Sequence, residues 1–151
     1  MRLVLLLVTA AFVLACGGGA LAKQAAASPT PVLCGAELSA RDAAGTLVGS
    51  THDSTTIRIA APQELRAGVE TSFRWQMTGI SALNVYGEQP AGPVGAWGRL
   101  PRVDPSAVEA VGDDTWVVRL TFPTAGCWRL HSERAGGKLA GDVWVDVLPR
   151  T

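Results

Sequence analysis

The chain has 151 residues, with 13 basic and 13 acidic side chains and a formal charge of zero. That length fits a single folded domain. Proteins that bind nucleic acid do so through clustered cations that displace counterions, and no run of like charges provides such a cluster here, so nucleic acid is excluded as a partner.

The first fifteen residues have the pattern of an export signal. An early arginine precedes an apolar run, Leu3–Leu14, which is too short to span a bilayer but has the length of a signal-peptide core. The run ends in Val13-Leu14-Ala15-Cys16, which resembles the lipobox of bacterial lipoproteins. The resemblance implies that residues 1–15 are removed and that a lipid on Cys16 anchors the protein to the extracytoplasmic face of a membrane in the bacterial cell envelope. The alternative is an ordinary secretory signal cut near Ala22, which would discard Cys16.

Residues 16–31 form a second segment, rich in Gly, Ala, Ser and Pro. This composition predicts a flexible tether. A short helix in its alanine-rich part would be stopped by Pro29 and Pro31. The chain is thus divided into a signal peptide (1–15), a tether (16–31) and a folded domain (32–151).

The folded domain has the pattern of β-strands, because short runs of alternating apolar and polar residues are separated by Gly, Pro, Asp and Asn. The alternation marks five inward faces, formed by Ile57 and Ile59; Phe73, Trp75 and Met77; Trp116, Val118, Leu120 and Phe122; Trp128 and Leu130; and Val143, Val145 and Val147. In Asp104–Val111 we expect one helical turn, because Asp104-Pro105 suits a cap followed by a first-turn proline. About seven to nine short strands indicate an all-β fold, an immunoglobulin-like antiparallel β-sandwich, with a small barrel as the alternative.

Cys34 and Cys127 are left as a pair if Cys16 carries the lipid. An exported protein resides in an oxidising compartment, so we expect a disulfide between them. Cys127 is out of phase with Trp128, and the bridge is therefore expected to staple the first strand to a late strand at the surface of a sheet. Two free thiols are the alternative.

The most distinctive motif of the chain is Phe122-Pro123-Thr124-Ala125-Gly126-Cys127-Trp128-Arg129-Leu130. It looks like the F-P-x-x-G-C-W-x-V stretch near the end of small secreted or lipid-anchored bacterial proteins of unknown function. In those proteins a Trp-Val strand closes the domain, as Trp144-Val145 would here. More loosely, the motif resembles the P-G-x-Y-x-V corner of immunoglobulin-like bacterial domains. The resemblance implies an immunoglobulin-like sandwich and brings no activity with it.

Residues for metal or catalytic chemistry are few. The two histidines, His52 and His131, are one too few for a three-histidine zinc site. Cys127 and His131 have the Cys-x-x-x-His spacing of a blue-copper site, but no methionine follows His131 and a disulfide would remove the thiolate. Ser132 and His131 could belong to a Ser/His/Asp set, although the chain has no G-x-S-x-G or S-x-x-K motif. We expect no metal, no cofactor and no enzymatic activity, with a small hydrolase or a cupredoxin-like metal protein as the alternative.

Binding is the function that the sequence favours. Tyr86, Trp97 and Arg99 lie in a Gly- and Pro-rich stretch, and loops on a rigid scaffold often carry binding residues. Trp144 is a further candidate, because it is out of phase with the neighbouring valines. For Trp97 the alternative is that its side chain folds back and caps one end of the sandwich. We expect a lipid-anchored, non-enzymatic binding or structural module whose ligand is a surface protein or a carbohydrate. The alternative is an accessory subunit of an envelope transporter or sensor complex.

Overall fold

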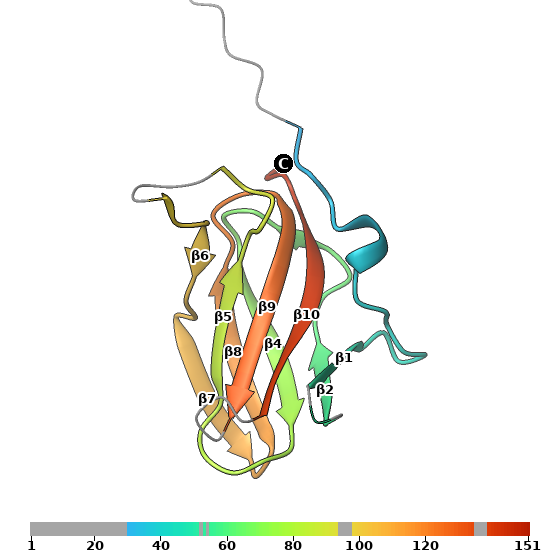
Figure 1. The fold of residues 1–151 in the computed structure, drawn as a ribbon, viewed down its shortest axis with the longest axis vertical. Coiled ribbons are helices and arrows are strands. Elements are labelled where there is room, and N and C mark those ends of the chain that lie inside the picture. Colours follow the sequence, from blue (N-terminus) through green and yellow to red (C-terminus); the bar gives the residue numbers. More distant parts are fainter. Residues whose placement is uncertain (1–29, 52, 54, 94–97, 135–138) are drawn as a thin grey trace, which may run out of the picture.

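The computed structural model describes residues 30–51, 53, 55–93, 98–134 and 139–151, which form an all-β sandwich (Figure 1). The predicted fold class is therefore confirmed. The strands are β1 (Leu47–Thr51), β2 (Thr56–Ala60), β3 (Leu65–Arg66), β4 (Glu70–Met77), β5 (Asn84–Glu88), β6 (Arg102–Val103), β7 (Ala107–Gly112), β8 (Thr115–Thr121), β9 (Gly126–Arg134) and β10 (Leu139–Leu148). Two of them, β3 and β6, are only two residues long and raise the number of strands above the expected range. A 3₁₀ turn, η1 (Gly35–Glu37), precedes the strands, and no helix within the described ranges is long and apolar enough to cross a bilayer.

The strands form two layers that are joined by β1. One layer has the order β6-β5-β9-β10, with β3 paired to the end of β10, and we call it the β5–β9–β10 sheet. The other has the order β2-β4-β8-β7, and we call it the β2–β4–β8 sheet. Strand β1 pairs with β10 on one side and with β2 on the other, so the two layers are continuous along that edge. In Figure 1 the β5–β9–β10 sheet lies in front of β4 and β8.

The core lies between the two layers and is rich in aromatic side chains. The side chains predicted to face inward on β2, β4, β8, β9 and β10 are all buried, which confirms the alternation. Phe73 makes edge-to-face contacts with Trp75 and Phe122, with ring centroids 6.4 and 6.3 Å apart. Phe122 also contacts Trp128 at 5.3 Å. Aromatic pairs of this kind each contribute about 1 kcal/mol beyond the area that they bury, so this cluster is the centre of the domain.

The segment from Asp104 to Val111 does not form the helical turn expected from its sequence. The Asp104 carboxylate accepts hydrogen bonds from the Arg102 guanidinium at 2.9 and 3.0 Å instead of capping a helix. Ala107–Gly112 forms the edge strand β7, in which Val108 lies opposite Val118 of β8. The prediction was wrong because pairing with β8 satisfies the backbone of this segment, and its valines suit a strand.

The motif Phe122–Trp128 forms a tight corner between β8 and β9. The indole nitrogen of Trp128 donates a hydrogen bond to the Thr124 carbonyl oxygen at 3.0 Å. The buried Gln89 joins the same corner, donating to the Ala125 carbonyl oxygen and accepting from the Thr124 hydroxyl, both at 2.7 Å. Gly126 turns the chain with a φ of 130°. The residues of the motif that carry the resemblance therefore have structural roles.

The substitution Gly126→Ala is expected to lower the free energy of unfolding by about 2 kcal/mol. The φ of 130° strains any residue with a Cβ, and that Cβ would lie 2.5 Å from Nε2 of Gln89. Gly45→Ala is the matched control, because Gly45 also has a positive φ, of 79°, but has no atom within 4 Å of an added Cβ. Urea denaturation of both variants measures the difference. Equal losses of unfolding free energy in the two variants would contradict the tight contact between Gly126 and Gln89.

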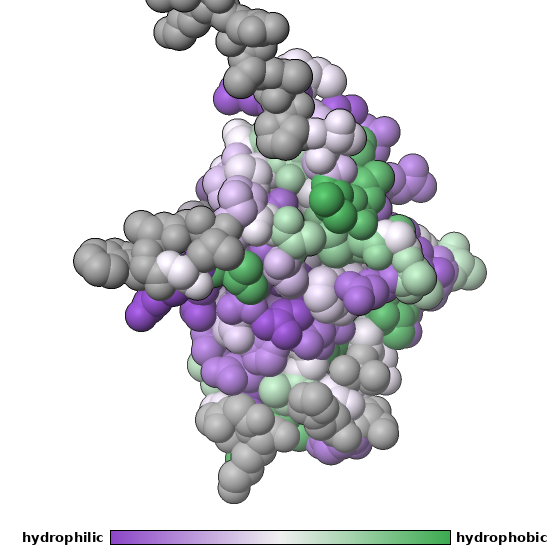
Figure 2. All heavy atoms as spheres, turned by 45° about the horizontal axis from the view of Figure 1, so that its top comes forward, coloured by the Kyte–Doolittle hydropathy of each residue, from purple (hydrophilic) through white to green (hydrophobic). Residues whose placement is uncertain are grey.

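Both ends of the described chain lie at one end of the sandwich. The described chain begins at residue 30 beside the C-terminus, and the strands of both sheets extend away from this end (Figure 1). Figure 2 is turned so that this end comes forward, and it shows hydrophobic patches separated by hydrophilic ones. We call it the tether end, after the tether predicted for residues 16–31.

Candidate binding face

The outer face of the β5–β9–β10 sheet carries two cross-strand rows of polar and aromatic side chains. In the first row, His131 of β9 lies between Tyr86 of β5 and Asp142 of β10. In the second row, Arg129 of β9 lies between Glu88 of β5 and Trp144 of β10. The two rows together contain six residues: Tyr86, Glu88, Arg129, His131, Asp142 and Trp144. Each alternates along its strand with buried residues of the core, so all six lie on the same side of the sheet. We call this set the binding face.

Tyr86 is held in place by two neighbours. The centroids of its ring and the His131 ring are 4.8 Å apart. The guanidinium carbon of Arg102, from β6, lies 3.9 Å from the centroid of the Tyr86 ring, which is a cation–π geometry. The tyrosine is therefore presented in a fixed orientation on a rigid sheet.

The ionisable groups of the binding face are paired with one another. His131 Nδ1 lies 2.7 Å from Asp142 Oδ1, and Arg129 bonds the Glu88 carboxylate. A second Arg129 nitrogen lies 3.8 Å from Asp142 Oδ2. Partial burial lowers the pKa of Arg129, but the bond to Glu88 and the negative charges of Asp142 and Glu88 raise that pKa, and the net direction is upward. Arg129 therefore stays cationic, and its neighbours hold its position.

Trp144 is half-buried at the edge of the binding face, next to the segment that precedes β1. The Trp144 amide donates to Ser39 Oγ at 2.8 Å, and the Ser39 amide donates to the Trp144 carbonyl oxygen at 3.1 Å. We call residues 32–39 the strap. The expectation that Trp144 lies off the core, facing solvent or a covering loop, agrees with this position.

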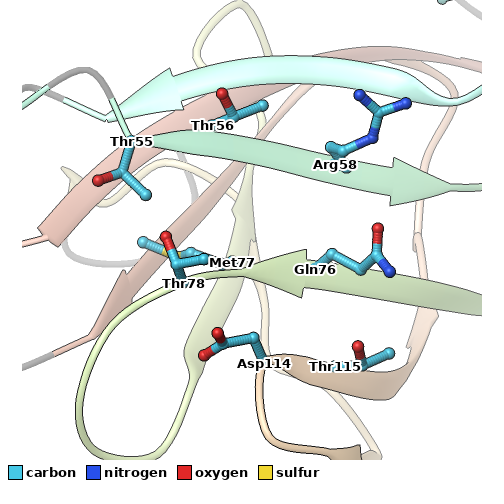
Figure 3. Close-up of a pocket in the computed structure, with 8 residues that line it drawn as sticks. All are labelled: Thr55, Thr56, Arg58, Gln76, Met77, Thr78, Asp114 and Thr115. Atoms are coloured by element: carbon cyan, nitrogen blue, oxygen red, sulfur yellow. The ribbon is translucent and has the colours of Figure 1, made fainter.

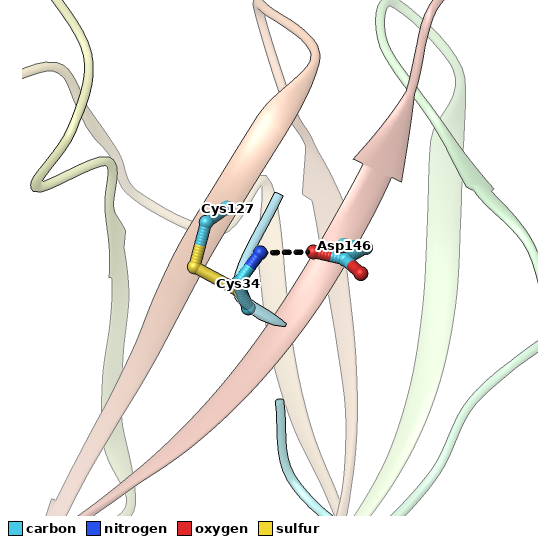
Figure 4. A group of neighbouring side chains, drawn as sticks. All are labelled: Cys34, Cys127 and Asp146. Atoms are coloured by element: carbon cyan, nitrogen blue, oxygen red, sulfur yellow. Dashed lines mark hydrogen bonds between the residues drawn. A yellow bond between two sulfur atoms is a disulfide. The ribbon is translucent and has the colours of Figure 1, made fainter. Parts of the chain in front are cut away.

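A disulfide between Cys34 and Cys127 fixes the strap to the outside of the sheet (Figure 4). The Cys127 amide donates to the Val32 carbonyl oxygen at 2.7 Å, and the Cys34 amide donates to Asp146 Oδ1, also at 2.7 Å. The bridge lies at the surface of the sheet, as predicted. The prediction that Cys34 belongs to the first strand was wrong. Cys34 lies in the strap immediately before η1, because the chain crosses β9 and β10 before it enters β1.

The residues considered for a metal site and for a catalytic nucleophile are placed unfavourably for those roles. Cys34, Cys127 and Asp146 have ligand atoms within 4.8 Å of one another, but both sulfurs belong to the disulfide and neither can act as a thiolate ligand. The copper hypothesis loses its cysteine for the same reason. Ser132 is completely buried and points to the core side of β9, opposite to His131, so these two residues do not form a catalytic pair.

Of the residues predicted to bind, Tyr86 and Trp144 come together on the binding face. Arg99 is exposed in the connection between β5 and β6. Cys16, His52 and Trp97 lie outside the described residues. Arg129 was not predicted as a binding residue, although it lies out of phase with the core residues Trp128 and Leu130, as Tyr86 does with its own neighbours on β5.

No family model matches the chain, and no curated protein matches its sequence.

Proposed function

We propose that this protein is a lipid-anchored, non-enzymatic binding module of the bacterial cell envelope, and that it binds a partner protein through the binding face. The observation that carries the proposal is the position of Tyr86 and Trp144 in adjacent rows, with Arg129 beside Trp144. Tyrosine, tryptophan and arginine are the residues most enriched at the energetic centres of protein interfaces. Because the side chains of Tyr86 and Arg129 are already held by their neighbours, fixing them on binding would cost little conformational entropy.

The position of the tether supports access to this face. With a lipid on Cys16, residues 17–29 would reach at most about 45 Å when fully extended. The binding face lies on the side of the sandwich, along strands that extend away from the tether end (Figure 1). A neighbouring envelope protein could then approach it from the side. This arrangement suits an accessory subunit of an envelope complex as well as an independent binding module.

Photo-cross-linking in the native membrane tests the proposed interface. A benzophenone amino acid at position 86 or 144 is expected to give a discrete adduct with one partner protein. The matched control is position 74, because Arg74 is exposed on β4 in the opposite sheet. In a binding assay with the purified partner, Tyr86→Ala is expected to weaken affinity by about tenfold or more. Equal adducts at positions 74 and 86, or none at 86 and 144, would contradict the assignment of this face.

Intact-mass measurement of protein extracted from its native membrane tests the anchor separately. The expected mass is that of residues 16–151 plus acyl chains, and Cys16→Ser is expected to release the protein from the membrane fraction. A chain that begins after Cys16 and carries no lipid would disprove the anchor, while leaving the binding face open to test.

A further inference from the structure

The β2–β4–β8 sheet carries a second surface with the properties of a ligand site. A hollow of ≈ 420 Å³ lies on its outer face at the end of the strands opposite the tether end (Figure 3). Arg58 of β2, Gln76 of β4 and Thr115 of β8 line it in one cross-strand row. Thr56 and Thr78 line it one step beyond that row. The hollow is therefore built from three neighbouring strands and is separate from the binding face.

Four neutral side chains of the hollow have free hydrogen-bonding groups. The side chains of Thr56, Gln76, Thr78 and Thr115 make no hydrogen bond to any other residue that the structure describes. A threonine hydroxyl can donate and accept, and a glutamine amide offers two donors and an acceptor. The threonine methyl groups add apolar surface between these polar atoms. The hollow thus presents donors, acceptors and small apolar patches at close spacing.

The charged groups of the hollow are already neutralised by partners outside it. Arg58 bonds the carboxylate of Asp42. Oδ1 of Asp114 accepts a hydrogen bond at 2.6 Å from Nη1 of Arg134, which is almost completely buried. An ionic ligand would have to compete with these pairs, whereas a neutral ligand would not. The free groups therefore favour an uncharged, polar ligand.

The same buried arginine makes the hollow rigid. Nη1 of Arg134 also donates to the Met77 carbonyl oxygen at 2.7 Å, at the end of β4. The Met77 amide in turn donates to the Asp114 carbonyl oxygen at 3.1 Å. The two strand ends that border the hollow are thus fixed to each other, and a ligand would meet a site that is already formed.

We propose that this hollow binds a neutral carbohydrate, such as one or two sugar units of an uncharged envelope glycan. Sugar hydroxyls both donate and accept hydrogen bonds, and they match the threonine hydroxyls and the glutamine amide. Sugar C–H groups match the threonine methyls. The volume is within the range of about 300–1,000 Å³ that is typical of small-molecule sites. This site goes beyond the proposed function, because it lies on the opposite sheet and does not depend on the binding face or on the anchor.

Amide chemical shifts of the isotopically labelled domain, titrated with neutral trisaccharides of glucose, mannose and N-acetylglucosamine, test the proposal. At least one of them is expected to cause saturable shifts confined to β2, the end of β4 and the start of β8. The double substitution Thr56→Val and Gln76→Leu, which removes the hydroxyl and the amide, is expected to weaken that binding by about tenfold or more. Thr121→Val, at the other end of β8, is the matched control and is expected to leave the affinity unchanged.

Three results would overturn the proposal. One is the absence of saturable shifts with every neutral trisaccharide. Another is undiminished binding by the double variant, provided that its spectrum shows the same fold. The third is stronger binding of an acidic trisaccharide, such as trigalacturonate, at the same residues, because it would show that the charges of Arg58 and Asp114 are not neutralised as described.

Discussion

Replacing Arg134 by methionine is expected to lower the free energy of unfolding by about 3 kcal/mol. The Arg134 side chain is 5% exposed and lies over the Trp116 ring, with its guanidinium carbon 4.6 Å from the ring centroid. It donates to the carbonyl oxygens of Met77 and Ser81, each at 2.7 Å. It also donates to the Asp114 carboxylate at 2.6 Å. Methionine would preserve the apolar packing of the stem but remove the guanidinium that donates to these acceptors.

Urea denaturation followed by tryptophan fluorescence measures this loss. The matched control is Arg119→Met, because Arg119 is a half-exposed arginine on β8 whose side chain is 41% exposed and pairs with Glu109 at 3.1 Å. Exposed ion pairs contribute little, so the control is expected to lose about 0.5 kcal/mol or less. Similar losses in the two variants would contradict the role of Arg134 as a buried clamp between β4, β8 and β9.

Removing the disulfide in the double variant Cys34→Ala and Cys127→Ala is expected to cost about 4 kcal/mol of stability in the chain-entropy model. The bridge joins residues that are 93 positions apart, and closing so long a loop restricts the unfolded chain strongly. Reducing the wild-type protein is expected to lower the urea midpoint in the same way.

The double variant also provides the control for the reductant. Its midpoint is expected to be the same with and without reducing agent, and equal to that of the reduced wild type. A wild-type midpoint that does not respond to complete reduction would show that the disulfide contributes nothing to stability.

The inward faces of the strands could be predicted from the sequence because alternation along one strand is a local property. Trp75 on β4 and Trp128 on β9 illustrate this, since each alternates with polar or small neighbours and each is completely buried. The edge strand β7 could not be predicted in this way. All but the first of its residues are exposed, so the strand has no buried face that would produce alternating apolar and polar residues. Its strand conformation depends on pairing with β8.

The candidate sites were predictable only in part. Residue type identified Tyr86 and Trp144 as binding candidates, but their common face depends on the register of three strands that are distant in sequence. The hollow on the other sheet depends on register in the same way. Arg134 did leave a local signal, because it is in phase with Trp128 and Leu130 on the inward side of β9. An arginine at an inward position predicts a buried cation with fixed partners.

The disulfide of the strap also determines how the domain would carry mechanical force. A pull on the tether would reach β9 directly through the covalent bond between Cys34 and Cys127. The chain between these two cysteines, including β1, would remain outside the load path. If a partner on the binding face pulled against the membrane, the force would therefore act as shear along β9, whose antiparallel ladder with β10 is long. Such a ladder resists shear with many hydrogen bonds at once, so the domain would stay folded under tension that could otherwise peel β1 from the sandwich.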